Sequence, residues 1–233
     1  MSNGSLARPP FLHVLVYSRA IPFAVFIALM ALDPWLAGLL EGVLDPRWLY
    51  GFRTLVVAGL LLLFWHKFDE LAALGQLRVK AVLLAIGAGL AVLAIWLLLD
   101  SGVYVLGDGG KGFDPRSADG SLDWSLALMR LAGSVLLVPV MEELFWRSLV
   151  MRWLDNADFA AVDPAQVGIR ALMLSSLVFG FEHSQWAAGI VAGLVYGWLY
   201  MRSRNLWVPV IAHAVTNAGL GFWVLANGTW HFW

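Results

Sequence analysis

The sequence has no cysteine and few charged residues. Because cysteine is absent from all 233 residues, disulfide bridges and thiolate chemistry are excluded, and a metal ion could be held only by histidine and carboxylate side chains. Only 13% of the residues are charged, about half the fraction typical of a soluble domain. The net charge of −1 and the lack of a basic tail argue against a nucleic acid partner.

What the sequence has instead is long apolar runs. Hydrophobic residues make up 61% of the chain, and they occur in runs of about 15 to 25 residues, the length that spans a bilayer. Unbroken runs of this kind exclude a β-barrel, whose strands alternate apolar and polar residues. We therefore predict an all-α, polytopic transmembrane bundle in the cell inner (cytoplasmic) membrane, with an additional interfacial helix at 35–44. Seven spans are expected, at 11–32, 48–65, 81–99, 124–154, the two halves of 171–201, and 206–226.

The charges predict an orientation and a division of the chain. An Asp- and Gly-rich loop, 100–123, falls on one side of the bundle with Lys111 and Arg116 as its only cations, so the positive-inside rule predicts N-in, C-out. We divide the chain into N-terminal spans with this loop (1–123), a catalytic membrane core (124–226) and a short aromatic tail (227–233). The residues expected on or near the cytoplasmic side are Lys67, Arg78, Lys80, Arg147, Arg152, Arg170, Arg202 and Arg204.

Ionisable groups inside apolar runs are costly and are therefore read as functional by default. The fourth span contains Glu142 and Glu143, followed by Arg147. Glu143 and Arg147 are four residues apart on a helix and can form an ion pair, which leaves Glu142 available for another role. Taken alone, the segment is explained equally well as the end of a helix that is exposed to water at the membrane interface.

Two further segments place histidines inside the bilayer. His183 follows Phe179 at the end of an apolar half-span. By itself, such a histidine is more often a hydrogen-bonded group at the membrane interface than a functional residue. His213 and Asn217 share one face of the last span. At 1.5 Å per residue, Glu142, His183 and His213 lie roughly 16, 20 and 13 Å from the basic ends of their spans. This common depth predicts one buried polar site, in a water-filled cavity reached from the cytoplasmic side.

A carboxylate and an imidazole that converge on one water can deprotonate it, and a second histidine with an amide can stabilise an oxyanion. This set suits amide hydrolysis inside a membrane. The HExxH, GxSxG and GxGD signatures and the P-loop are missing, and the segment Gly109–Gly112 is predicted to be a turn.

The same residues resemble the motifs of the CPBP intramembrane proteases. This family includes the CAAX prenyl endopeptidase and bacterial relatives linked to bacteriocin processing. It shows EExxxR, then FxxxH, then HxxxN or HxxxD, in that order on successive membrane helices. The resemblance covers about 131–225, and the aromatic tail is similar to a bacterial subgroup found with exosortase (PEP-CTERM) systems. The matching residues are Glu142, Glu143 and Arg147, then Phe179 and His183, then His213 and Asn217.

The resemblance implies roles for these residues. Glu142 and His183 would activate the water, His213 and Asn217 would bind the oxyanion, and Glu143, Arg147 and Phe179 would be supporting residues. It favours a metal-independent mechanism without a cofactor; zinc held by Glu142, His183 and His213 is the alternative. The chain departs from the family at Trp146 and Ser148, where Phe and Gly are usual, and at Glu182, an additional charge. These departures bear on the choice of substrate.

The resemblance implies a partner as well as a reaction. The partners are the bilayer and a protein or peptide substrate, with a lipidated, CAAX-like protein as one candidate, and the oligomeric state is left open. The first alternative is a non-catalytic membrane factor of the same fold, such as an immunity or scaffold protein. The second is a transporter, which the absence of an inverted repeat disfavours.

Overall fold

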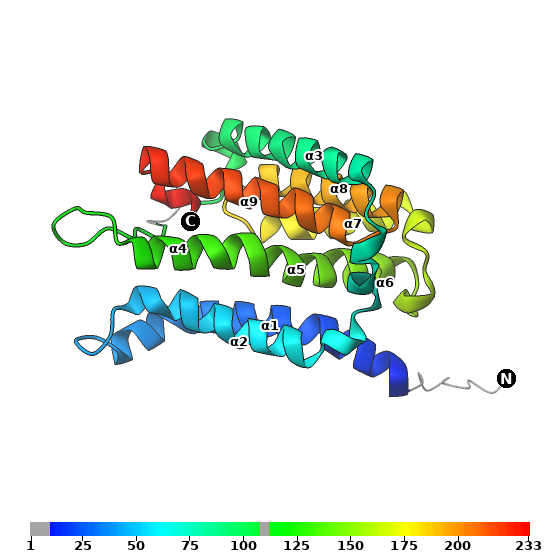
Figure 1. Cartoon of the computed structure of the whole chain (residues 1–233), viewed down its shortest axis with the longest axis horizontal. Coiled ribbons are helices and arrows are strands. Elements are labelled where there is room, and N and C mark those ends of the chain that lie inside the picture. Colours follow the sequence, from blue (N-terminus) through cyan, green and yellow to red (C-terminus); the bar gives the residue numbers. More distant parts are fainter. Residues whose placement is uncertain (1–9, 108–111) are drawn as a thin grey trace.

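The computed structural model describes residues 10–107 and 112–233, which form a bundle of helices without any β-strand (Figure 1). The predicted all-α bundle is confirmed. The predicted turn at Gly109–Gly112 and the counter-charge Lys111 involve residues 108–111, which lie outside the described ranges. The principal helices are α1 (Pro10–Leu39), α2 (Leu49–Leu63), α3 (Val79–Leu98), α4 (Trp124–Ala132), α5 (Val138–Glu143), α6 (Arg152–Asp155), α7 (Ile169–Phe181), α8 (Trp186–Ser203) and α9 (Trp207–Asn227).

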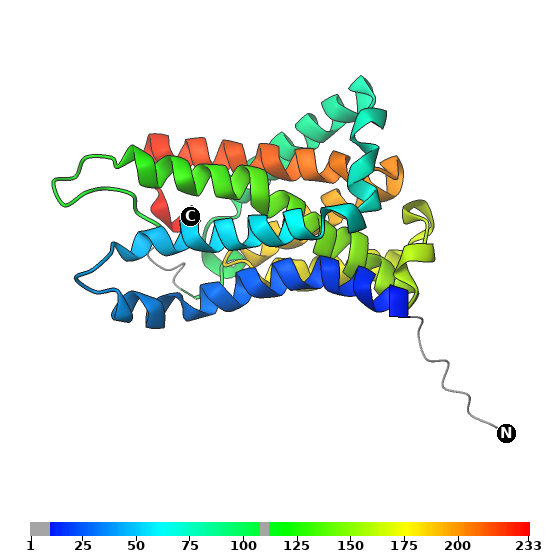
Figure 2. The same ribbon diagram turned by 60° about the horizontal axis from the view of Figure 1, so that its bottom comes forward.

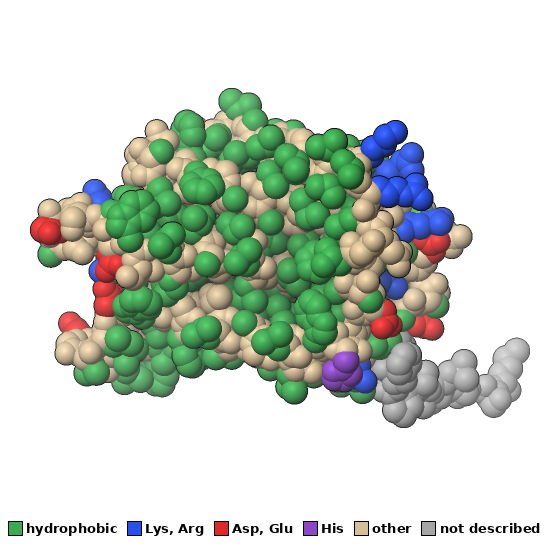
Figure 3. All heavy atoms as spheres, viewed as in Figure 1, with side chains coloured by type: hydrophobic (Ala, Val, Ile, Leu, Met, Phe, Trp, Pro, Cys, Tyr) green, Lys and Arg blue, Asp and Glu red, His purple; other side chains and the backbone are tan. Residues whose placement is uncertain are grey.

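Several helices are suited to a bilayer. Among the described residues, four helical segments are long and apolar enough to cross a membrane: His13–Leu39, Val79–Leu98, Trp124–Asp155 and Trp207–Asn227. Large apolar side chains cover the outside of the bundle, as expected for a surface that faces lipid (Figure 3). The chain is thus a multi-pass membrane protein. The count of seven spans stays a prediction, because α2, α7 and α8 fall short in length or hydropathy.

The first helix corrects one expectation. We expected a span ending near 32 and a separate interfacial helix at 35–44, but α1 continues through Asp33 and Pro34 to Leu39. Asp33 does not break the helix because its carboxylate accepts a hydrogen bond from Arg53 of α2 at 2.6 Å. The proline removes one backbone hydrogen bond, which a long helix packed against a neighbour can tolerate.

Helices α7 and α8 form an antiparallel hairpin whose outer ends both lie at the end of the bundle near the N-terminus (Figures 1 and 2). Their close approach depends on small residues: a Cβ on Gly193 would lie 2.8 Å from the Cα of Ser176. Gly189, Gly193 and Gly197 follow one another at intervals of four residues, and all three face α7.

The tip of this hairpin, residues 182–185, contacts the segment that follows α3. Its open turn is covered by the segment that follows α3. The Leu106 amide donates to the Ser184 carbonyl at 2.7 Å, and Trp186 Nε1 donates to the Val103 carbonyl at 3.0 Å. Protein groups therefore satisfy backbone polar atoms that lipid could not.

Charge is distributed unequally between the two ends of the bundle. Most of the visible lysine and arginine side chains gather at the end near the N-terminus, whereas acidic side chains are visible at both ends (Figure 3). The segment 112–123 lies at the end opposite the N-terminus (Figure 1). We refer to these as the basic end and the loop end. The asymmetry has the form that the positive-inside rule requires, and the N-in orientation remains a prediction.

Candidate active site

The site is built on the long helix Trp124–Asp155, which is not regular. It widens into π-helix at Gly133–Leu137 and again at Leu144–Met151, on either side of α5. The Val138 amide bonds to the Gly133 carbonyl five residues back. In the same pattern the Ser134 carbonyl would pair with residue 139, but Pro139 has no N–H. One carbonyl in the middle of the bundle is left free.

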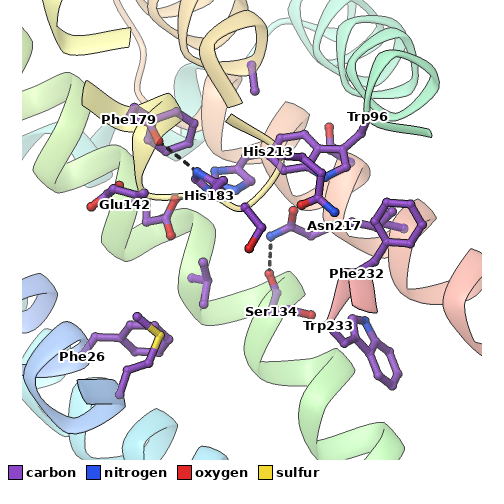
Figure 4. Close-up of a pocket in the computed structure, with 18 of the residues that line it drawn as sticks. Phe26, Trp96, Ser134, Glu142, Phe179, His183, His213, Asn217, Phe232 and Trp233 are labelled. Carbon is purple, nitrogen blue, oxygen red and sulfur yellow. Dashed lines mark hydrogen bonds and ion pairs between the residues drawn. The ribbon is translucent and has the colours of Figure 1, made fainter. Parts of the chain in front are cut away.

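Asn217 of α9 is the hydrogen-bond partner of this carbonyl. Its side-chain amide nitrogen donates to the Ser134 oxygen at 2.8 Å (Figure 4). The contact fixes which end of the amide is the nitrogen, because a carbonyl can only accept. One N–H of Asn217 remains for another acceptor.

The second carboxylate of the motif, Glu143, is fully buried and paired. Its Oε2 lies 3.2 Å from Nε of Arg147, so the predicted i, i+4 pair is confirmed. Its Oε1 lies 3.0 Å from Nδ1 of His213. The Arg147 guanidinium also stacks over the ring of Phe179, with Cζ 4.3 Å from the ring centre. Glu143 thus joins the long helix to α9.

Glu142 takes no part in the ion pair of Glu143 and Arg147. Its Oε2 atom is buried and has no hydrogen-bond partner among the described residues. The nearest recorded group is Nε2 of His213 at 3.9 Å, too long for a direct hydrogen bond. A carboxylate held in this way has free acceptor capacity for a water or a substrate.

The two histidines are both held through Nδ1. His183 Nδ1 lies 2.9 Å from the Phe179 carbonyl, and its ring meets Trp96 edge-on at 5.3 Å between centroids. His213 is held by Glu143 and stacks on Tyr196 at 5.0 Å. Because a carbonyl can only accept, the neutral form of His183 carries its proton on Nδ1. Its Nε2 is then free to accept a proton.

These side chains surround one cavity of about 290 Å³. The structure brings together Glu142, His183, His213 and Asn217, which all line it, with Phe179 in the wall (Figure 4). The close-up shows Phe26 of α1 across the space from these polar groups. The shared site that we predicted from depth along the helices is therefore present.

The expected access from the basic end is wrong for this structure. The cavity extends towards the loop end, where Arg53, Arg130 and Trp233 line it, and no lysine or arginine of the basic end belongs to its wall. At the basic end, Glu70 bonds to Arg19 and Ser148 across the neighbouring helices. Counting residues along helices gives depth but does not show which end of a cavity side chains fill.

Zinc held by Glu142, His183 and His213 is the alternative that the sequence leaves open. Among the described residues, no group of three His, Asp or Glu side chains is placed to hold a metal ion. The expectation of a metal-independent mechanism stays a prediction.

Several residues of the cavity wall escaped the sequence analysis. Phe26, Trp96 and Trp233 come from distant segments and carry no signal that separates them from other aromatic residues. Arg53 and Arg130 are different, because each is a charge within an apolar helix. The rule that identified Glu142 would have identified both.

Comparisons with known proteins match the part of the chain that builds the cavity. Residues 124–219 match the family model described as "Rce1-like: Type II CAAX prenyl endopeptidase Rce1-like". The chain is also similar to "Putative membrane peptidase YdiL" of Bacillus subtilis (strain 168), with 26% identity over 113 residues. That match covers 46% of this chain and 43% of the relative, less than half of either. No solved structure matches the chain. The segment matched by the family model contains all of the three motifs.

Proposed function

We propose that the chain is a membrane protease of the CAAX/CPBP type, the family whose model residues 124–219 match, and that it hydrolyses a peptide bond of a membrane-associated protein. The observation that carries the proposal is the unpartnered Glu142 carboxylate, which faces a cavity shared with His183, His213 and Asn217. A buried carboxylate without a partner is expensive, so its retention is explained best by a reaction that uses it.

The proposed reaction uses water as the nucleophile. Glu142, with Nε2 of His183 as a second acceptor, takes a proton from a water in the cavity while the resulting hydroxide attacks the peptide carbonyl. The carbonyl oxygen becomes an oxyanion in the tetrahedral intermediate. The proton returns from Glu142 to the leaving nitrogen as the carbon–nitrogen bond breaks, which restores the carboxylate.

The oxyanion is bound by donors of α9. Asn217 retains one N–H after bonding to Ser134, and its amide is held in position by that bond. His213, held at Nδ1 by Glu143, can donate from Nε2 when it is protonated. Donors that are already oriented stabilise the intermediate without reorganisation. Arg147 neutralises Glu143 and so maintains the position of His213.

The wall formed by α1 indicates an apolar substrate. It contributes Phe23, Phe26, Ile27 and Met30 to the cavity. A hydrophobic peptide segment in extended form can lie against this wall, and a lipidated, CAAX-like protein is one candidate. The proposed place of the reaction is a bacterial inner membrane.

The experiment that tests the proposal compares protein termini in cells that carry the unaltered chain or Glu142→Gln. Mass spectrometry of membrane proteins should find new termini only with the unaltered chain. Glu41→Gln is the matched control, because Glu41 is exposed and far from the cavity wall. Identical termini with all three chains, each inserted at equal level, would reject hydrolysis and favour the non-catalytic alternative.

Metal independence is tested on the purified protein. Activity should persist after exhaustive treatment with a chelator, since Glu142 and His183 would supply the base directly. Loss of activity in chelator, restored by added zinc, would contradict this part of the proposal.

A further inference from the structure

Two arginines line the loop end of the same cavity, and the proposed chemistry does not use them. Arg53 of α2 is 5% exposed and Arg130 of α4 lies beside it. Both guanidinium groups stack on the ring of Tyr50, with Cζ 5.3 Å and 4.2 Å from its centre. We call Arg53 and Arg130 the arginine pair.

The arginine pair carries more positive charge than its surroundings neutralise. Arg53 bonds to Asp33 through Nη1 at 2.6 Å, but its buried Nε has no partner. Arg130 has no carboxylate within 4.0 Å among the described residues, and its buried Nε is also without a partner. Among the described residues, Asp33 is therefore the one carboxylate within ion-pair distance of the two guanidinium groups.

Three further acidic residues at the loop end are paired with other cationic side chains. Asp45 pairs with Arg47 at 2.5 Å, and Asp114 pairs with Arg116 at 2.6 Å. Asp100 lies 3.0 Å from His231. The ordinary structural explanation of a buried arginine is a buried counter-ion, and Arg130 has none in the described part of the chain.

The position of Arg130 relative to the catalytic carboxylate suggests what the pair is for. Arg130, Ser134, Val138 and Glu142 all line the cavity, at intervals of four residues along one helix. In a regular α-helix this row would drift around the axis by about 40° per step. The π-helical turn at Gly133–Leu137 has more residues per turn and counteracts the drift. The row thus follows the cavity from Glu142 to Arg130.

The length of this row fits a short peptide. Twelve residues of helix correspond to roughly 18 Å between the Cα atoms of Glu142 and Arg130. An extended peptide covers about 3.3–3.6 Å per residue, and the two side chains shorten the gap from both ends. About three to five substrate residues therefore separate the bond at Glu142 from a group at Arg130.

We propose that the arginine pair binds a carboxylate of the substrate, either a side chain or a chain end, three to five residues from the scissile bond. A guanidinium group offers two parallel N–H donors to a carboxylate, and the partial burial of the site strengthens such a contact. Tyr50 holds both arginines in place when the site is empty. The assignment as a substrate subsite rests on the proposed function, whereas binding of the carboxylate does not require cleavage.

The test measures binding to the Glu142→Gln chain, so that hydrolysis cannot interfere. The protein is placed in nanodiscs of phosphatidylcholine, and binding is followed by fluorescence anisotropy. The probes are three labelled hexapeptides of leucine and alanine: one with a free terminal carboxylate, one with a carboxamide, and one carboxamide with a penultimate aspartate. Both carboxylate probes should bind roughly 10- to 100-fold more tightly than the neutral probe.

Variants assign the preference to the arginine pair. Arg130→Gln in the Glu142→Gln chain should remove the difference in affinity between the acid and amide probes. Arg130→Lys should retain part of this difference, because lysine keeps the charge but lacks the two parallel N–H donors of the guanidinium group. Arg116→Gln is the matched control and should leave the difference unchanged, since Arg116 is exposed and paired with Asp114. The comparison of the three probes on the Glu142→Gln chain uses no arginine variant, so it remains valid even if an arginine variant fails to fold.

Three results would overturn the proposal. The first is equal affinity for acid and amide probes, including no binding of either. The second is a preference that survives Arg130→Gln in folded protein. The third is a preference that disappears when phosphatidylglycerol replaces part of the phosphatidylcholine, because the pair would then be a site for lipid phosphate. A carboxylate preference without any cleavage activity would reject the proposed function and leave the binding site intact.

Discussion

Two buried polar clusters lie along the same long helix, and they differ in whether their polar groups are satisfied. At the basic end, Arg19, Glu70, Ser148 and Arg152 form what we call the saturated network. Arg19 donates to Glu70, Ser148 and the carbonyls of neighbouring segments, and Arg152 donates to Glu70 and to the carbonyls of Ala160 and Val162. None of its side-chain atoms is buried without a partner.

The cluster around the cavity is the opposite case. Glu142 Oε2, Glu143 Oε2 and two nitrogens of Arg147 are buried without a hydrogen-bond partner, although Glu143 and Arg147 form an ion pair. A satisfied network lowers the energy of the fold and rigidifies it, whereas unsatisfied groups beside a cavity keep capacity for a ligand. Substitutions in the saturated network should therefore change stability, and those at the cavity should change activity.

The largest expected effect is that of Glu142→Gln. The change removes the proposed base, so the rate of cleavage should fall by about 10²–10⁴-fold, while the melting temperature should stay close to that of the unaltered chain. His183→Ala should give a comparable loss of activity. The measurement is cleavage of an identified substrate beside thermal unfolding in the same detergent, with Glu41→Gln as control. A large fall in melting temperature for Glu142→Gln would break the distinction between the clusters.

Arg147→Ala sharpens the comparison, because Arg147 lies at the boundary between the two roles. Its removal leaves Glu143 buried with only His213 as partner, which should cost about 3–5 kcal/mol and lower the yield of folded protein. Arg204→Ala is the control, since Arg204 is largely exposed. Normal yield together with lost activity would move Arg147 from support to chemistry.

Asn217→Ala tests the oxyanion wall. Loss of one donor should lower turnover by about 10²–10³-fold with little change in KM. Asn227→Ala is a matched control, because Asn227 lies on the exposed end of the same helix. Pro139→Ala should also lower turnover, by roughly tenfold, because a new N–H at residue 139 would compete with Asn217 for the Ser134 carbonyl. Unchanged turnover in both variants would remove Asn217 from the mechanism.

The smallest expected effect is that of Glu70→Gln in the saturated network. It replaces charge-assisted hydrogen bonds by neutral ones, which should cost about 1.5–3 kcal/mol and leave the rate of cleavage by folded protein unchanged. Thermal unfolding and a cleavage assay below the melting temperature measure both effects. Loss of activity in fully folded Glu70→Gln protein would show that the network takes part in the reaction.

The pH dependence of the same group has a definite sign. Burial alone would raise the pKa of Glu70, but the charge and hydrogen bonds of Arg19 and the Ser148 hydroxyl lower it below the ordinary value of 4.5. The stabilisation by Glu70 is therefore complete above about pH 4.5 and is lost as the pH falls through the lowered pKa. Between these limits the stability difference between the unaltered chain and Glu70→Gln should shrink with decreasing pH. A constant difference would contradict the ionised state of Glu70.

The sequence was sufficient for the elements of the site but not for its surroundings. The i, i+4 spacing of Glu143 and Arg147 predicts their pair, and equal depth along three helices predicts the shared cavity. The π-helical turns were not predictable from periodicity, because they depend on how Pro139 and Asn217 meet across two helices. Access from the basic end was wrong for a related reason: the contacts that fill that end join segments far apart in sequence, such as Arg19 with Ser148.

The most direct test of the central claim measures cleavage and stability together in Glu142→Gln and Glu70→Gln, prepared side by side. The account predicts that Glu142→Gln loses the new protein termini at an unchanged melting temperature, and that Glu70→Gln keeps the termini at a lowered one. Continued formation of the same termini by fully folded Glu142→Gln would contradict it.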